Sequence, residues 1–167
     1  MTNRRLEIEV PPGEPAVVFR RLVDAPPELV FAVWTEPEHL RNWWGPRQFE
    51  LVVCEIDPRA GGQYRFVQRP PDGQEHAFHG VYREFDRPQR LVRTFVYAGA
   101  PDDESVETVT FQCDGRGTLI TGASVFPSFS ASEYYAQGGM EVGLRESNQR
   151  LDEWLGAITH ETNRRQS

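Results

Sequence analysis

Two histidines and two carboxylates lie in one stretch of alternating residues, 76–86, and are the first candidates for chemistry. His76 and His79 could ligate a metal ion, but residues three apart on a β-strand point to opposite faces, so one site cannot easily take both. Glu84 and Asp86 share a strand face, and such a pair could do acid–base work if it were buried in a cavity. Most such pairs are solvated, and we therefore expect no metal site and no catalytic residue here.

Other signals of catalysis are missing from the sequence. It contains no nucleophile elbow, no phosphate-binding glycine loop and no set of zinc ligands, and Gly61-Gly62 lies where a strand begins rather than between a strand and a helix. Cys54 and Cys113 occur in apolar, strand-like stretches, which favours buried free thiols. We expect no cofactor, and the sequence leaves open whether the protein is an enzyme.

Composition limits the classes of partner. The chain of 167 residues carries 25 acidic and 18 basic residues, a net charge of −7, and every basic residue is Arg. This balance argues against nucleic acid or an anionic membrane surface as the main partner. Because no apolar run approaches the length of a membrane span and the N-terminus lacks the apolar core of a signal peptide, we expect no membrane insertion and a cytoplasmic protein.

The element that must cover any site is a long amphipathic segment at 130–158. Ser130 followed by Glu133 predicts a capping box at its start. Residues of one face recur every three or four positions, as an α-helix requires; they are Met140, Leu144, Ser147, Leu151, Trp154 and Ile158.

Three glycines interrupt this segment, and an interior glycine costs about 1 kcal/mol relative to alanine. They are Gly138, Gly139 and Gly143. Either the helix breaks near Gly138 and restarts, or the missing side chains leave space for a neighbouring backbone or a ligand.

The N-terminal third predicts one strand and two short helices. We expect residues 1–15 to form a flexible tail with a short edge strand at 6–10. Residues 16–24 are expected to form the first strand. A helix is expected to begin at about Pro26. Thr35, with Glu38 completing a capping box, predicts a second short helix over 39–44.

From Phe49 onward the hydrophobic period changes to two, which predicts a meander of strands joined by turns rich in Gly, Pro and Asp. The strands are expected at 49–57, 62–69, 76–86, 89–98, 105–113 and 117–126. With the first strand they make a seven-stranded, curved, mostly antiparallel sheet. One apolar face of this α+β sheet must be covered, and only the C-terminal helix is long enough to do so. A single domain over 16–158 follows, with flexible tails at 1–15 and 159–167.

This order of elements resembles the helix-grip fold of the SRPBCC/START-like superfamily, which includes START domains and the birch-pollen allergen. Within it, the chain is similar to the branch named for the C-terminal domain of the activator of the heat-shock protein 90 ATPase. The resemblance is carried by residues 18–46, 54–66, 80–95 and 138–155, and most specifically by Trp-Trp-Gly-Pro at 43–46 and Asp-x-Arg-x-Gly-Gly at 57–62. These motifs are signatures of fold rather than of chemistry.

The resemblance implies a cavity between the C-terminal helix and the concave face of the sheet, which the superfamily uses for apolar molecules. Its expected lining consists of Trp43, Phe49, Tyr64, Phe66, Tyr82, Phe95, Tyr97, Phe111, Met140, Gly143, Leu144 and Ser147. Ordinary core packing is the competing interpretation for each of these residues. The leading expectation is a module that binds a small hydrophobic or amphipathic molecule.

Two other classes of function remain open. One is a cyclase or hydrolase whose polar cavity residues would be Tyr64, Tyr82, Glu84 and Ser147. The other is a stress-related co-chaperone that acts on a heat-shock ATPase, as the name of the branch suggests. A homodimer through an exposed sheet edge is also plausible, because edge strands pair readily unless charge or proline blocks them.

Overall fold

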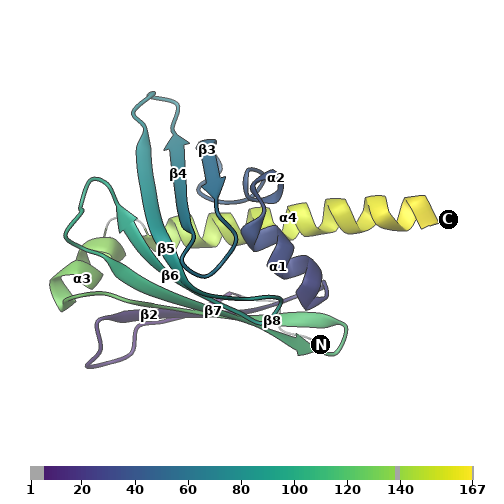
Figure 1. Cartoon of the computed structure of the whole chain (residues 1–167), viewed down its shortest axis with the longest axis horizontal. Helices are drawn as coiled ribbons and strands as arrows, with labels where there is room; N and C mark the ends of the chain where they lie inside the picture. Colours follow the sequence, from purple (N-terminus) through teal and green to yellow (C-terminus); the bar gives the residue numbers. More distant parts are fainter. Residues whose placement is uncertain (1–5, 138–139, 167) are drawn as a thin grey trace.

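The computed structural model describes residues 6–137 and 140–166 and contains one antiparallel sheet with helices on its concave side (Figure 1). The strands are β1 (Glu7–Glu9), β2 (Ala16–Val23), β3 (Glu50–Ile56), β4 (Gln63–Arg69), β5 (His76–Asp86), β6 (Arg90–Tyr97), β7 (Ser105–Asp114) and β8 (Gly117–Val125). Their order across the sheet is β1-β2-β8-β7-β6-β5-β4-β3. The sheet thus has eight strands rather than the predicted seven, because the short edge strand expected in the N-terminal tail pairs with β2 and joins the sheet.

Local irregularities bend the sheet. The register shifts between Tyr82 and Glu84 where β5 pairs with β6, and between Leu51 and Val53 where β3 pairs with β4. Such bulges bend a strand and increase its twist. Gly80 allows β5 to approach β6 closely, since a Cβ atom at this position would lie 1.9 Å from the carbonyl oxygen of Thr94.

The first helices are α1 (Pro27–Thr35) and α2 (Pro37–Leu40). The predicted capping role of Thr35 is wrong: Thr35 is the last residue of α1, and its hydroxyl donates a hydrogen bond to the carbonyl of Phe31 at 2.7 Å. Glu36 occupies the N-cap position of α2 without a side-chain cap. The helix predicted over 39–44 therefore begins earlier and is shorter, because Pro37 sets the backbone of its first turn.

The C-terminal segment forms α3 (Phe129–Gln137) and α4 (Met140–Gln166), so its predicted bounds are wrong. The cap is Ser128 rather than Ser130, since the Ser128 hydroxyl accepts a hydrogen bond from the Ala131 N–H at 3.1 Å. α4 continues past Ile158 and projects beyond the sheet (Figure 1). Gly138 and Gly139 lie outside the described residues, whereas Gly143 lies within α4.

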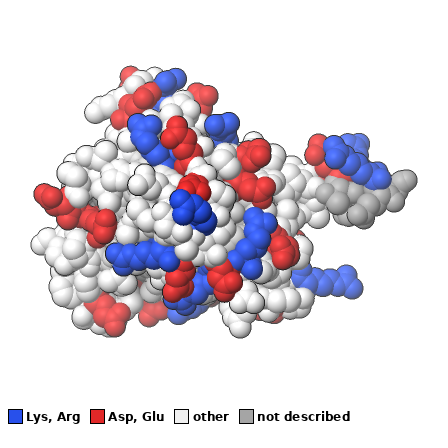
Figure 2. All heavy atoms as spheres, viewed as in Figure 1, with Lys and Arg blue, Asp and Glu red and all other residues white. Residues whose placement is uncertain are grey.

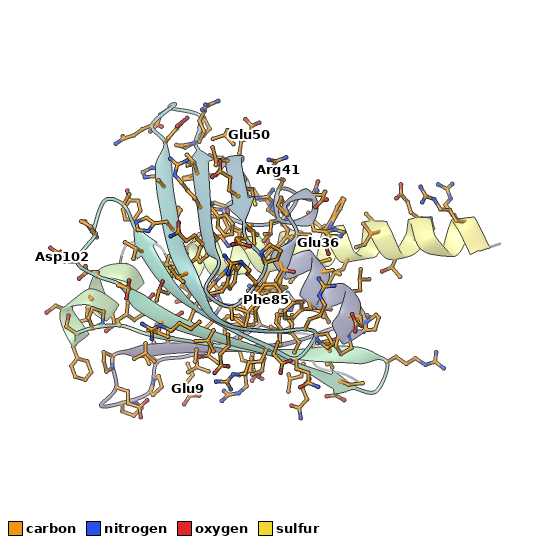
Figure 3. All side chains as sticks on the ribbon, in the orientation of Figure 1. Glu9, Glu36, Arg41, Glu50, Phe85 and Asp102 are labelled. Carbon is orange, nitrogen blue, oxygen red and sulfur yellow. The ribbon has the colours of Figure 1, made fainter. Side chains whose placement is uncertain are left out.

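The core lies between the concave face and the helices, where the side chains crowd in Figure 3. Phe85 points into this space, while Glu9, Glu50 and Asp102 point away from the fold. Leu151 and Leu155 of α4 are buried here with aromatic residues of α1 and the strands. This arrangement confirms the α+β helix-grip architecture.

Polar contacts fix α4 to the loop that follows α2. The Nη1 atom of Arg150 donates to the carbonyls of Gly45 at 2.9 Å, Pro46 at 3.2 Å and Trp44 at 3.4 Å. The N–H of Gly45 donates to the Ser147 hydroxyl at 2.9 Å. Burial lowers the pKa of Arg150, and the nearby charge of Arg47 lowers it further. The Trp-Trp-Gly-Pro segment thus serves as the docking point of α4.

We expect Arg150→Met to lower the free energy of unfolding by about 1–3 kcal/mol, because several backbone carbonyls lose a charged donor. Urea denaturation followed by circular dichroism measures the change. The matched control is Arg145→Met on the same helix, which removes only the exposed pair with Glu141 and should cost less than about 0.5 kcal/mol. Equal losses in the two variants would contradict the docking role.

Candidate functional site

A buried charged pair lies at the centre of the concave face. Arg93 of β6 is paired in register with Glu107 of β7 on one side and with Tyr82 of β5 on the other. Its Nε and Nη2 atoms lie 2.8 and 2.7 Å from the Oε1 atom of Glu107. The side chain of Arg93 is 3% exposed and that of Glu107 is 17% exposed, so the pair is shielded from bulk water but open on the Glu107 side.

The environment keeps this site in a defined charge state. Burial alone would lower the pKa of Arg93, but the carboxylate of Glu107 and the neighbouring tyrosines outweigh it, and the net shift is upward. Burial raises the pKa of the Tyr82 hydroxyl, and the charge of the Arg93 guanidinium, together with a hydrogen-bonding contact to it, opposes that rise. Tyr82 therefore stays a neutral donor beside a guanidinium that stays charged.

Two donors of this cluster are left unpaired. Among the described residues, neither the Nη1 atom of Arg93 nor the hydroxyl of Tyr82 has a well-aligned hydrogen-bond partner, apart from the contact between the Tyr82 hydroxyl and the Arg93 guanidinium, although both atoms are buried. Tyr64 differs, since its hydroxyl donates to the carbonyl of Thr94 while its ring lies 5.1 Å from the guanidinium carbon of Arg93. Buried polar groups in native proteins are nearly always paired, so two neighbouring exceptions mark a place that can receive an acceptor atom.

Next to this cluster the concave face ends in partly exposed aromatic side chains, which we call the aromatic end: Trp44, His76, Phe78, Phe95 and Tyr97. Phe78 is the hub, with ring centroids 5.4 Å from Trp44, 5.4 Å from Phe95 and 5.2 Å from Tyr97. His76 Nδ1 lies 2.8 Å from the Tyr97 hydroxyl. Phe95 and Tyr97 follow Arg93 at alternate positions of β6, so the aromatic end and the charged pair form one continuous strip.

The predicted lining residues divide into groups. Trp43 and Phe111 are buried around Trp34, with centroid distances of 5.0 and 5.8 Å from it, and act as core. Tyr64, Phe66 and Tyr82 are buried near the charged pair. The partly exposed members are Phe49, whose ring stacks on His76, and Phe95 and Tyr97 of the aromatic end.

The residues predicted on α4 have mixed roles. Ser147 is buried and serves the docking of α4 described above. Leu144 is partly buried against the main core, and a Cβ atom on Gly143 would lie 3.8 Å from Pro46. The side chain of Met140 lies outside the described residues.

A separate hollow of about 650 Å³ lies on the other face of the sheet. It is lined by Glu55, Ile56, Asp57, Gln63, Tyr64, Arg65, His79, Gly80, Val81, Thr94, Val96 and Glu104. Of the predicted lining residues whose side chains the structure describes, only Tyr64 borders it. Its exposed walls carry charges of both signs, whereas the charged pair on the concave side is shielded from bulk water. On the face drawn in Figure 2, acidic and basic side chains are interspersed.

The other candidates for chemistry are not assembled. His76 belongs to the aromatic end and His79 to the outer hollow, which confirms that they face opposite sides. Glu84 is exposed and paired with Arg90 at 2.8 Å, whereas Tyr82 and Ser147 are buried. Within the described part of the chain no group of His, Cys, Asp and Glu could hold a metal ion. Cys54 is a buried thiol as expected, but Cys113 is exposed near the end of β7.

Sequence reasoning missed Arg93 and Glu107, although a signal was present. In the stretch Arg90–Tyr97, Arg93 alternates with Leu91 and Phe95, which places a charge on the apolar face of the strand. Glu107 likewise alternates with Val109 on β7. A charge at an inward position of a strand is the pattern that could have identified the pair.

None of the helices in the described residues has the length and apolar content needed to cross a membrane. No match was found among proteins of curated function. Solved structures with the same fold include a protein of Rhodobacter sphaeroides, 26% identical, with a TM-score of 0.83 over 91% of this chain and 99% of that one. A solution structure from Arthrobacter aurescens is 25% identical, with a TM-score of 0.83 over 90% and 91% of the two chains.

The AHSA1 protein of Silicibacter pomeroyi is 20% identical, with a TM-score of 0.71 over 86% of this chain and 99% of that one. The model of one protein family, described as activator of Hsp90 ATPase homolog 1-like protein, matches residues 24–156. The match covers the span from the end of β2 to the middle of α4 and includes the strip and the docking loop. The chain therefore belongs to the family of activator of Hsp90 ATPase homolog 1-like proteins, within the SRPBCC superfamily.

Proposed function

We propose that the protein binds a small hydrophobic or amphipathic molecule between the concave face of the sheet and the C-terminal helix. The observation that carries this proposal is the aromatic end. Its side chains face the concave side, yet they remain partly exposed, whereas the aromatic side chains around Trp34 are buried. Apolar surface that a fold leaves uncovered in a concave place is typical of a ligand site.

The outer hollow is a weaker candidate for this ligand. Its walls include the exposed side chains of Glu55, Arg65, His79 and Glu104, which an apolar molecule would have to desolvate. The aromatic end instead offers ring faces and edges at its surface. An apolar molecule placed there releases water from its own surface and from the rings, and this release drives binding.

We expect Phe95→Ala to weaken binding of the neutral fluorescent probe N-phenyl-1-naphthylamine by roughly 10-fold, because about half the hydrophobic contribution of a phenylalanine is lost. Titration of probe fluorescence measures the affinity. The matched control is Val81→Ala, on the adjacent strand but in the outer hollow. A loss of affinity in Val81→Ala with none in Phe95→Ala would move the site to the outer face.

A second candidate function comes from the family itself, whose name describes activation of the Hsp90 ATPase. Under this alternative the chain changes the ATPase rate of the heat-shock protein 90 homologue of its own host. We expect a measurable rise in phosphate release when the two proteins are mixed at saturating concentration. An unchanged ATPase rate would remove this alternative. If the chain still binds the fluorescent probe, the proposal of ligand binding stays intact.

A further inference from the structure

We infer that Arg93 and Tyr82 recognise a single neutral oxygen atom, a hydroxyl or carbonyl group at the inner end of an otherwise apolar ligand. This inference rests on the proposed function and names the chemical class of molecule that the same site would take. It begins from the two unpaired donors, the Nη1 atom of Arg93 and the hydroxyl of Tyr82. Tyr82 is fully buried, and only 3% of the Arg93 side chain is exposed.

The two donors belong to neighbouring residues on one face of the sheet. Tyr82 and Arg93 are directly paired across β5 and β6, and side chains at such positions project from the same face as neighbours. The rest of the guanidinium is already fixed, because Nε and Nη2 bind Glu107 and the Tyr64 ring lies alongside. The direction of the remaining donor is therefore set before any ligand arrives, and little side-chain entropy is lost on binding.

Charge balance decides between a neutral and an ionised acceptor. Glu107 already neutralises Arg93, so a second carboxylate would lie beside a carboxylate in a buried place. Like charges brought together where water is excluded repel strongly, and the desolvation of the newcomer would be poorly repaid. A hydroxyl or carbonyl oxygen accepts the same hydrogen bonds without that repulsion.

The strip supplies the rest of the recognition. Phe95 and Tyr97 extend from Arg93 along β6, and Phe78 lies against both. A molecule with its oxygen at Arg93 and Tyr82 would lay its apolar body along these rings. Neutral amphipathic molecules such as long-chain alcohols, ketones and esters fit this order of groups.

The test compares displacement of N-phenyl-1-naphthylamine by 1-octanol, 2-octanone, octanoate and 1-bromooctane. A purely apolar site prefers 1-bromooctane, because this halide is the most hydrophobic of the four molecules. We expect the alcohol and the ketone to displace the probe at concentrations roughly 10-fold lower than 1-bromooctane, as a buried hydrogen bond from a charged donor allows. We expect octanoate to be weaker than both.

The variant that isolates the effect is Tyr82→Phe, which removes only the hydroxyl. We expect the affinity for 1-octanol to fall several-fold, by up to roughly 10-fold, while that for 1-bromooctane changes by less than about 2-fold. The melting temperature should change little, since the buried hydroxyl has no well-aligned partner and its one polar contact is with the guanidinium of Arg93. Tyr64→Phe is the control, because that hydroxyl is already bonded to Thr94 and the preference for oxygen should remain.

The double variant Arg93→Met/Glu107→Met removes the charged pair without leaving one charge unpaired, and it should also lose the preference. Each other outcome overturns the inference. Equal displacement by all four molecules, a preference for octanoate, an unchanged preference in Tyr82→Phe, or a large loss of thermal stability in that variant would do so while probe binding still stands. If the probe does not bind at all, the proposed function fails as well.

Discussion

The attachment of α4 to the loop at Trp44–Pro46 is the interaction on which the other features depend. A sheet with one apolar face needs a cover, and α4 is the only long helix in the described residues. Few backbone positions of α4 lie close to those of the strands, so the helix is held by side chains. Arg150 and Ser147 bind the loop, while Arg21 of β2 bonds Asn148 and Asp152 farther along the helix.

This mode of attachment has a consequence for the concave face. The helix covers the core around Trp34, whereas the aromatic end, to which Trp44 of the docking loop belongs, stays partly exposed. The buried pair of Arg93 and Glu107 separates the aromatic end from the closed core. Along its length the concave face thus changes from the buried core around Trp34, through the pair of Arg93 and Glu107, to the partly exposed aromatic end.

Membership of the family establishes the fold and leaves the chemistry to be argued from the site. The related structures share the arrangement of strands and helix at identities of 20–26%. Fold alone does not specify function, since one scaffold serves many sites. The proposals for the ligand therefore depend on the pair of Arg93 and Glu107 and on the aromatic end.

The sequence by itself determined the elements and their order. Each of the seven predicted strands is present to within one residue at either end, because alternation of side chains and Gly-Pro-Asp turns are local signals. The caps at Thr35 and Ser130 were misplaced because several polar residues near a helix start satisfy the same local rule. Only the tertiary structure decided which aromatic residues became core and which stayed exposed, and that Arg93 meets Glu107 and Tyr82. Those outcomes depend on the register of neighbouring strands and on where α4 docks, and both are set by contacts between residues distant in the sequence.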